Sequence, residues 1–518
     1  MRPNIVIVMT DQHRADLRRG CGYALDTMPY LDSFASEGTD FRRAYTPNPV
    51  CMPARISMFT GRYASSHKAR TNHNLRDVIR GDDLLDVLKR AGYKTALCGK
   101  NHTYREKGCF DYVKATGHLG TADDGTFNEA QQRFEDFLSA SKHMESHVPS
   151  PGGAENQHPY RNVSAAFDFL DNHRGDDPFF MWLSFSEPHN PYQVPAPYFD
   201  MFPPKDLPPI TCGAECCELK GSDYVWERNA WVSVLGEDHE KRIARVRSNY
   251  HGMLRLIDDQ FKRFMEGLEQ RDLRKNTVVV FLSDHGDFVG EYGLIRKGVG
   301  LPEVLTRINM AWQGPGIVNS LDNEHCVSLV DILPTVCELC GEPVPFGCQG
   351  RSLLPLLRGE KVPEKEFDTA YCEFGHGGLY WNEKDKLTVA DDRCITDGTT
   401  FACISSWTSG GQLRSLRKGD MKILMDMMGR GQLYDLSADP FEIDNLWDNA
   451  EYAVQRADML AELCAAVLRA DDPIPAPHNR YRSKQHPRGY WFDEEYVSDD
   501  PGVRDDRIAD YLRGKGSK

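Results

Sequence analysis

The chain has 518 residues with an ordinary apolar content of 40%, so it is long enough for two or three domains, or for one large α/β domain with an appendage. Its formal net charge is −15, and it contains no block of lysine and arginine. This charge argues against a nucleic acid as the main partner, but it allows a small anionic substrate, because a few local cations outweigh a diffuse negative surface.

The N-terminal sequence predicts a buried strand at Asn4–Met9, immediately after the first three residues. This apolar run is too short to be the core of a signal peptide. No other segment approaches the roughly 20 apolar residues that a membrane-spanning helix needs. We therefore expect a cytoplasmic protein with no membrane partner. The fifteen cysteines, an odd number, agree with reduced thiols in such a compartment.

Predicted helices and strands alternate along the first two thirds of the chain. Amphipathic stretches predict helices at 28–37, 83–90, 127–141, 163–172 and 240–269. Fully apolar runs predict buried strands at 4–9, 95–98, 178–184 and 277–282. This alternation is typical of an α/β fold with a large, mixed but mostly parallel sheet flanked by helices. We assign residues 1–365 to that catalytic domain.

The pattern changes in the last third of the chain. Shorter segments at 367–374, 400–406 and 421–425, followed by a helical pattern at 452–469, predict a smaller α+β domain with an antiparallel sheet. We assign residues 366–470 to this domain and residues 471–518 to a C-terminal tail. Residues 210–230 form an insertion that contains three cysteines and no assigned element.

Polar residues follow the predicted strands at the points where the strands end; these residues are Asp11, Lys100, His189, Asp284 and His285. Because the carboxyl ends of parallel strands meet at one edge of a sheet, we expect these side chains to form one site. Asp11, Asp284 and His285 offer oxygen and nitrogen ligands for a divalent cation, and Gln12 adds an amide oxygen. A turn or a helix cap is the alternative role for Asp11 taken alone.

Cys51 lies at the predicted start of a helix that ends near Gly61. Pro53 suits the first turn of such a helix, and the backbone N–H groups of a helix N-terminus stabilise negative charge. Arg55 follows one turn later on the same face. A nucleophile with a cation one turn behind it fits anion-transfer chemistry. The alternative is an inert buried thiol, which is the commoner fate of a lone cysteine.

The run Cys51-Met52-Pro53-Ala54-Arg55, followed by Thr60-Gly61-Arg62, resembles the signature of type I sulfatases, members of the alkaline phosphatase superfamily. The usual signature has serine where this chain has Ala54. Further segments resemble elements of that family in the same order along the chain; these are Gly99–His102, Ser186–Tyr192, Ser283–Asp287, Lys297-Gly298, Gln432–Leu436, Asp439-Pro440 and Asn445-Leu446.

The resemblance implies that a separate maturation enzyme oxidises Cys51 to formylglycine (3-oxoalanine). One hydroxyl of the hydrated aldehyde, held on a divalent metal, would attack the sulfur of a sulfate ester. The resemblance implies Ca²⁺, with Mg²⁺ or Mn²⁺ as alternatives, bound by Asp11, Gln12, Cys51, Asp284 and His285.

The remaining catalytic roles also come from the resemblance. Arg55, Lys100, His189 and Lys297 are expected to neutralise the sulfate oxygens and the developing charge. His102 is expected to be the base that expels the bound sulfate, and His189 or Lys297 the group that protonates the leaving oxygen.

Three functions remain open from the sequence. The first is a sulfatase that acts on a carbohydrate or a small organic or aryl sulfate. The second is a phosphonate monoester or phosphodiester hydrolase, because related enzymes of that class also carry Asp-Gln where many sulfatases have two aspartates, as at Asp11-Gln12 here. The third is a non-catalytic relative that binds anions. Lys100 and His102 favour the sulfatase. The leaving group and the oligomeric state stay open.

Overall fold

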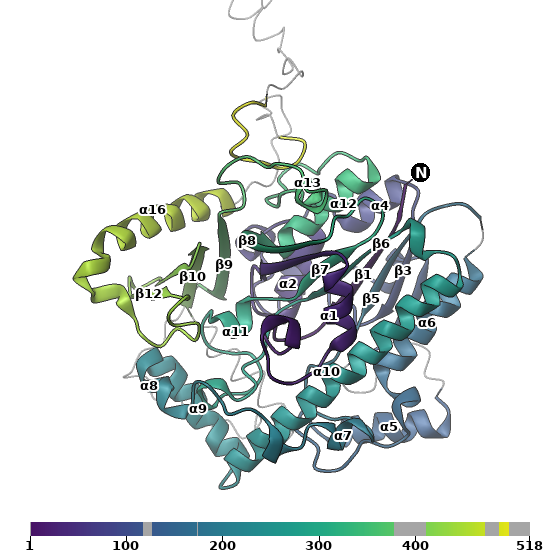
Figure 1. The fold of residues 1–518 in the computed structure, drawn as a ribbon, viewed down its shortest axis with the longest axis horizontal. Helices are drawn as coiled ribbons and strands as arrows, with labels where there is room; N and C mark the ends of the chain where they lie inside the picture. The colour runs from purple at the N-terminus through teal and green to yellow at the C-terminus, as the bar shows by residue number, and fades with distance from the viewer. Residues whose placement is uncertain (1, 118–126, 174, 378–410, 472–485, 497–518) are drawn as a thin grey trace, which may run out of the picture.

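The computed structural model describes residues 2–117, 127–173, 175–377, 411–471 and 486–496. A large sheet with helices on both faces forms the main body of the molecule, and a smaller sheet lies beside it (Figure 1).

The large sheet has eight strands in the order β4-β3-β5-β1-β6-β7-β2-β8. The strands are β1 (Asn4–Thr10), β2 (Thr39–Tyr45), β3 (Lys94–Gly99), β4 (Tyr112–Ala115), β5 (Phe179–Ser184), β6 (Thr277–Ser283), β7 (Met310–Gln313) and β8 (Ser320–Ser328). Only the two pairings of β7, with β6 and with β2, are antiparallel. The prediction of a mixed, mostly parallel sheet is therefore confirmed, and the four predicted strands are its central members β1, β3, β5 and β6.

Helices cover both faces of this sheet, as the alternation predicted. One face packs against α1 (Pro29–Ser36), α6 (His158–Asn172) and α10 (His239–Gln270), and the other against α2 (Cys51–Thr60), α4 (Leu84–Arg90) and α12 (Ile332–Cys340). Within β1, Val6 and Val8 face the first layer, whereas Ile5 and Ile7 face the second, because successive strand residues point to opposite faces.

Further helices lie around this core; they are α3 (Ala64–His67), α5 (Glu129–Ala140), α7 (Tyr198–Met201), α8 (Cys217–Lys220), α9 (Ser222–Leu235), α11 (Glu303–Thr306) and α13 (Leu354–Leu357). Helices α8 and α9 come from the insertion that the sequence left unassigned. Its cysteines, like every other cysteine in the described ranges, are free thiols. Across the same ranges, no helix combines the length and the apolarity that crossing a membrane requires.

A buried ion cluster links α5 to α6. His158 is 2% exposed, and its Nε2 lies 3.1 Å from a carboxylate oxygen of Glu135 while its Nδ1 lies 3.6 Å from one of Glu187. Burial opposes the charge on the imidazole, but the hydrogen bonds to these two glutamates outweigh it and raise the pKa of His158 to about 9.

We expect this cluster to make stability depend on alkaline pH. The raised pKa means that the stabilisation is complete below the unfolded-state pKa near 6.5 and is lost as the pH rises through about 9; the loss is about 3 kcal/mol. Urea unfolding of the parent and of His158→Gln at about pH 6 and about pH 10 checks this. The stability advantage of the parent should shrink at the higher pH, and an equal advantage at both values would rule the linkage out.

The smaller sheet is antiparallel, in the order β12-β11-β10-β9. Its strands are β9 (Thr369–His376), β10 (Gly411–Lys418), β11 (Met421–Asp426) and β12 (Gly431–Asp435). Helix α16 (Ala453–Ala470) packs on one face of it, at the left of Figure 1. The predicted segments 367–374 and 421–425 and the terminal helix are therefore present, whereas the predicted strand at 400–406 lies outside the described residues.

Buried ion pairs hold the other face of the small sheet against the large domain. Lys422 of β11 donates from Nζ to the carbonyl oxygen of Leu301 at 2.7 Å and to carboxylate oxygens of Glu303 and Glu442, each at 2.9 Å. These side chains are at most 9% exposed. Paired charges at this depth hold the segment after Lys297 in a fixed place against the small sheet.

Candidate active site

The carboxyl ends of four central strands meet at one point of the large sheet. The backbone N–H of Asp284, after β6, donates to the carbonyl of Thr10 at the end of β1 (3.1 Å). The N–H of Lys100, after β3, donates in the same way to Ser184 at the end of β5 (2.8 Å). The strand-end residues that the sequence singled out are thus brought together.

Cys51 is the first residue of α2 and its side chain points into this meeting point. Its Sγ accepts a hydrogen bond from Lys297 Nζ at 3.0 Å, lies 3.2 Å from His285 Nε2 and donates to Asp11 Oδ1 at 3.5 Å. The residue is 0% exposed. The predicted helix is confirmed, and it ends at Gly61, whose φ of 62° is the left-handed conformation that glycine adopts without strain.

The charges around Cys51 favour an anion at its sulfur position. Burial opposes ionisation, but Lys297, Lys100 and His285 together hold the pKa of the thiol well below its usual range. The same surroundings raise the pKa of Lys297: burial disfavours its charge, but Cys51, Asp11 and Asp284 together outweigh burial. The position occupied by Sγ is therefore built to hold negative charge next to ammonium groups.

Two more histidines face Cys51. Burial, with Lys297, lowers the pKa of His189 to about 3, and burial, with Lys100, lowers the pKa of His102. Hydrogen bonds to Cys51 act in the opposite direction in both cases. The Nδ1 atom of His189 lies 2.6 Å from the carbonyl oxygen of Asn190, so Nδ1 carries the proton and Nε2 is the basic nitrogen.

Arg55 lies beneath the cluster and contacts its carboxylates. Its Nε donates to Asp284 Oδ2 at 2.9 Å, and one terminal nitrogen donates to Asp11 Oδ2 at 3.1 Å. The other terminal nitrogen donates to Ser184 Oγ at 2.8 Å and to the Lys100 carbonyl at 3.1 Å. All three guanidinium nitrogens contact protein acceptors, where they orient the two carboxylates. The expected role of Arg55 toward the sulfate oxygens stays a prediction.

The buried residues Asp11, Cys51, Asp284 and His285 form a group whose ligand atoms all lie within 4.8 Å of one another. Burial and the charge of Asp11 raise the pKa of Asp284, which shows that the second carboxylate lacks full compensation. The Nδ1 of His285 lies 2.8 Å from the Gly286 carbonyl oxygen, so Nδ1 carries a proton and Nε2 is the nitrogen that faces the group. This group therefore fits a divalent cation, and the carboxylate oxygens of Asp11 and Asp284 are ligands that suit Ca²⁺, Mg²⁺ and Mn²⁺.

Gln12 is oriented by a residue to which the sequence assigned no role. Its Nε2 donates to Asp287 Oδ2 at 2.7 Å, and the same oxygen accepts from Tyr192 Oη at 2.7 Å. The amide oxygen of Gln12 therefore faces Lys297, whose Nζ donates to it at 2.9 Å. Gln12 stays a predicted metal ligand. Asp287 positions Gln12, and through Gln12 it positions Lys297.

We expect Asp287→Asn to lower kcat for an aryl sulfate by about tenfold, because an asparagine presents a competing N–H donor to Gln12 and frees Lys297. Metal content, measured on the same sample, should fall only in part, because both carboxylates and His285 remain in place. A kcat equal to that of the parent would show that the orientation of Gln12 does not matter for turnover.

His143 is a second residue that sequence reasoning missed. It follows α5, and its Nδ1 accepts from the side-chain amide of Asn190 at 3.2 Å, with its ring 6.4 Å from that of His189. Burial and Arg296 lower its pKa to about 4. No motif surrounds His143 in the sequence. Its position beside His189 therefore appears only in the folded structure.

The sulfatase family model matches residues 3–342 of this chain. The chain is similar to an arylsulfatase of Clostridium perfringens, with 28% identity over 504 residues that cover 90% of this chain and 95% of the relative. It is also similar to the uncharacterized sulfatase YidJ of Escherichia coli, with 27% identity over 94% of this chain and 90% of the relative.

Among solved structures, a phosphonate monoester hydrolase from Silicibacter pomeroyi has the same fold. Its TM-score is 0.73 at 20% sequence identity, and the match covers 96% of this chain and 100% of that chain. This likeness concerns the arrangement of the sheets and helices.

Proposed function

This chain belongs to the sulfatase family of the alkaline phosphatase superfamily and is a sulfuric ester hydrolase; from that premise we propose that it cleaves a carbohydrate or small aryl sulfate with an oxidised Cys51 as nucleophile. One observation carries the proposal: a fully buried Cys51 at a helix N-terminus, in contact with Lys297, His285 and Asp11. An inert core cysteine is surrounded by apolar side chains, whereas this one is surrounded by charge.

Two groups that the family implies fit this site. Asp11, Asp284, His285 and the amide oxygen of Gln12 would hold the cation, and Cys51 would carry the aldehyde. When bound, the cation supplies positive charge for anionic oxygens, and the hydrated aldehyde supplies a hydroxyl nucleophile and a route for sulfate release.

The side chains around Cys51 bind the substrate, orient the carboxylates and exclude water. The ammonium groups of Lys100 and Lys297 bind sulfate oxygens, because they converge on the position that Sγ occupies. Arg55 acts on the substrate through the carboxylates that it orients. The near-complete burial of the cluster excludes water from it.

Proton transfer falls to three residues. His102 and His189 have lowered pKa values, so each is a neutral base. Lys297 donates from Nζ to Cys51 Sγ at 3.0 Å, so its ammonium group is placed to give a proton to the leaving oxygen. Of the two donors that the sequence left open, this favours Lys297 over His189.

A phosphonate monoester or phosphodiester hydrolase is the second candidate. The Asp11-Gln12 pair favours it, because related hydrolases of that class carry Asp-Gln at this place, as the resemblance implies. Lys100 and His102 beside Cys51 favour the sulfate ester.

Co-expression with a formylglycine-generating enzyme, the partner that we propose for Cys51, provides the test. We expect hydrolysis of para-nitrophenyl sulfate to rise in proportion to the aldehyde content measured by peptide mass spectrometry. Activity that is independent of aldehyde content would remove the oxidised residue from the proposal.

We also propose that the protein works in the cytoplasm, where free thiols persist. The cysteines in the described ranges, including the neighbouring Cys212, Cys216 and Cys217, are all free. Cell fractionation checks this, and recovery in an extracytoplasmic fraction would overturn it.

A further inference from the structure

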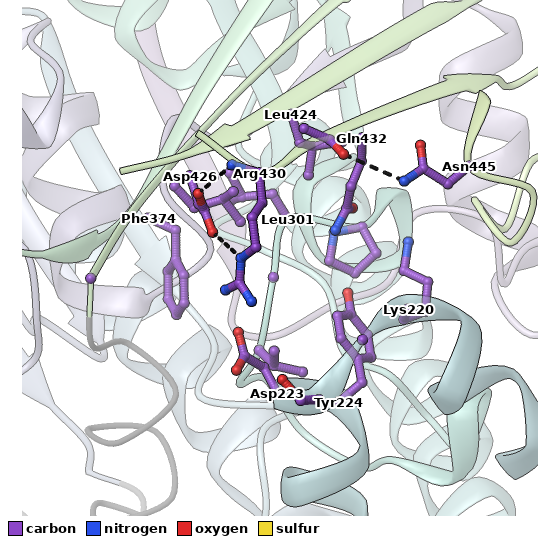
Figure 2. Close-up of a pocket in the computed structure, with 18 of the residues that line it drawn as sticks. Lys220, Asp223, Tyr224, Leu301, Phe374, Leu424, Asp426, Arg430, Gln432 and Asn445 are labelled. Carbon is purple, nitrogen blue, oxygen red and sulfur yellow. Dashed lines mark hydrogen bonds and ion pairs between the residues drawn. The ribbon is translucent and has the colours of Figure 1, made fainter. Parts of the chain in front are cut away.

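A cavity of about 290 Å³ lies between the insertion helices and the small sheet (Figure 2). Helices α8 and α9 form one wall, β11 and the turn into β12 form the opposite wall, and the segment Val299–Pro302 lies between them. A volume of this size accommodates a sugar ring with its hydrogen-bonding partners.

The cavity lies close to the catalytic cluster but is separate from it. The residues that line it include none of the strand-end residues around Cys51. Val299, which lines the cavity, is two residues beyond Lys297, a distance of at most about 7 Å along the chain. The segment is held at both sides, by Glu227 Oε2, which accepts from Val299 N–H at 2.8 Å, and by Lys422 at Leu301.

Gly300 also shapes the wall. Its φ is 76°, and a Cβ placed on it would lie 2.4 Å from the hydroxyl of Tyr224. Glycine is therefore required for the backbone to lie against this tyrosine. The backbone at Gly300 is therefore closely packed against Tyr224.

Opposite charges face each other across the cavity. Arg430 donates from Nε to Asp426 Oδ2 at 2.7 Å, and Figure 2 shows the Asp223 carboxylate pointing toward the Arg430 guanidinium from the other wall. Asp223 has no hydrogen bond or ion pair with any residue in the described ranges. The Asp223 carboxylate can therefore accept hydrogen bonds from a ligand, and it faces a guanidinium that Asp426 holds in place.

The other surfaces of the cavity suit a ring with a polar edge and an apolar face. The rings of Phe374 and Tyr224 are part of its lining, as are the amide side chains of Gln432 and Asn445. An aromatic ring packs on the apolar C–H face of a sugar, and planar charged groups and amides bind its hydroxyls with directional hydrogen bonds. Among the lining side chains, the carboxylates of Asp223 and Asp426 are balanced by the guanidinium of Arg430 and the ammonium of Lys220, so the lining carries no net formal charge, which suits an uncharged ring.

We propose that this cavity binds an uncharged sugar ring adjoining the sulfated unit, so that the preferred substrate is a sulfated oligosaccharide. Vicinal hydroxyls of the ring donate to Asp223 and accept from Arg430, and its apolar face packs on Phe374. This proposal rests on the proposed sulfatase function and names the leaving group that this function left open.

The test compares matched substrates on matched variants. The substrates are para-nitrophenyl sulfate, mono-O-sulfated lactose and cellobiose isomers, and the corresponding sulfated monosaccharides. The variants are Asp223→Ala and Arg430→Ala, with Glu218→Ala as control, because Glu218 is an exposed carboxylate of the same insertion that does not line the cavity.

We expect at least one sulfated disaccharide to be cleaved with a higher kcat/KM than its monosaccharide. Asp223→Ala and Arg430→Ala should each raise KM for that disaccharide about tenfold, with kcat and the aryl sulfate constants within about twofold of the parent. Glu218→Ala should match the parent on every substrate. Unchanged aryl sulfate kinetics also show that the variants are folded.

Two results would overturn the proposal: no disaccharide better than its monosaccharide, or an unchanged disaccharide KM in both cavity variants. Failure of the sulfatase function itself would appear separately, as a parent that is inactive on aryl sulfate. In that case, saturation-transfer NMR with unsulfated lactose and cellobiose tests sugar binding directly. Binding to the parent but to neither cavity variant would still support the sugar site. No binding by the parent would reject it.

Discussion

Replacement of Cys51 by alanine is expected to lower kcat for para-nitrophenyl sulfate by at least about 1,000-fold. Cys51 is the only residue of the cluster that offers a nucleophilic atom at the N-terminus of α2, and Lys297, His285 and Asp11 all point at it. Alanine leaves these side chains in place but removes the reacting atom. Initial-rate kinetics on matched amounts of folded protein measure the effect.

Cys98→Ala is the matched control. Cys98 is equally buried and lies two residues before Lys100, but it packs in the apolar core beside β5, and burial raises its pKa. We expect this variant to keep kcat within about threefold of the parent, because it removes a thiol without touching the charged cluster. A Cys51→Ala protein as active as Cys98→Ala would remove Cys51 from the mechanism.

Loss of the cation should have a comparable effect. Asp284→Asn is expected to lower kcat by at least about 100-fold and to lower the bound metal measured by elemental analysis. The substitution removes one of two carboxylates that lie within 4.8 Å of each other and of His285. Dialysis of the parent against a chelator should reproduce the loss, and added Ca²⁺ should restore activity to the parent but not to the variant.

Asp258→Asn supplies the control for this experiment. Asp258 is a buried carboxylate on α10 that caps α1 by accepting from the N–H groups of Tyr30 and Leu31, each at 2.8 Å. Burial raises its pKa to about 7, so its neutral form is already accessible near neutral pH. Its loss should leave metal content unchanged. Full activity of the chelated parent would contradict a metal-dependent site.

The sequence predicted the centre of the large sheet and missed its edges, for a physical reason. Strands β1, β5 and β6 are buried on both faces and therefore consist of continuous apolar runs. Strand β2 contains Arg42 and Arg43, and β8 is largely polar, because these strands lie toward one edge and are partly exposed. Their pairing depends on contacts that no local pattern records.

The site was predictable where a residue follows an apolar strand or belongs to a recognisable run, as Asp11, Lys100 and Asp284 do. What each side chain contacts was not predictable. Arg55 lies on the same helix face as Cys51, but the acceptors that fix its guanidinium come from three other strand ends. Asp287 contacts the site through Gln12, and His143 contacts Asn190 next to His189; such relayed contacts leave no spacing in the sequence.

We propose that sulfate is the preferred ester at Cys51. The most direct measurement is kcat/KM for para-nitrophenyl sulfate and for phenyl para-nitrophenyl phosphonate on one preparation with measured aldehyde content. We predict that the sulfate has the higher kcat/KM and that Cys51→Ala loses both activities together. Phosphonate turnover without sulfate turnover in the same oxidised preparation would contradict the account and assign the site to the phosphonate hydrolase instead.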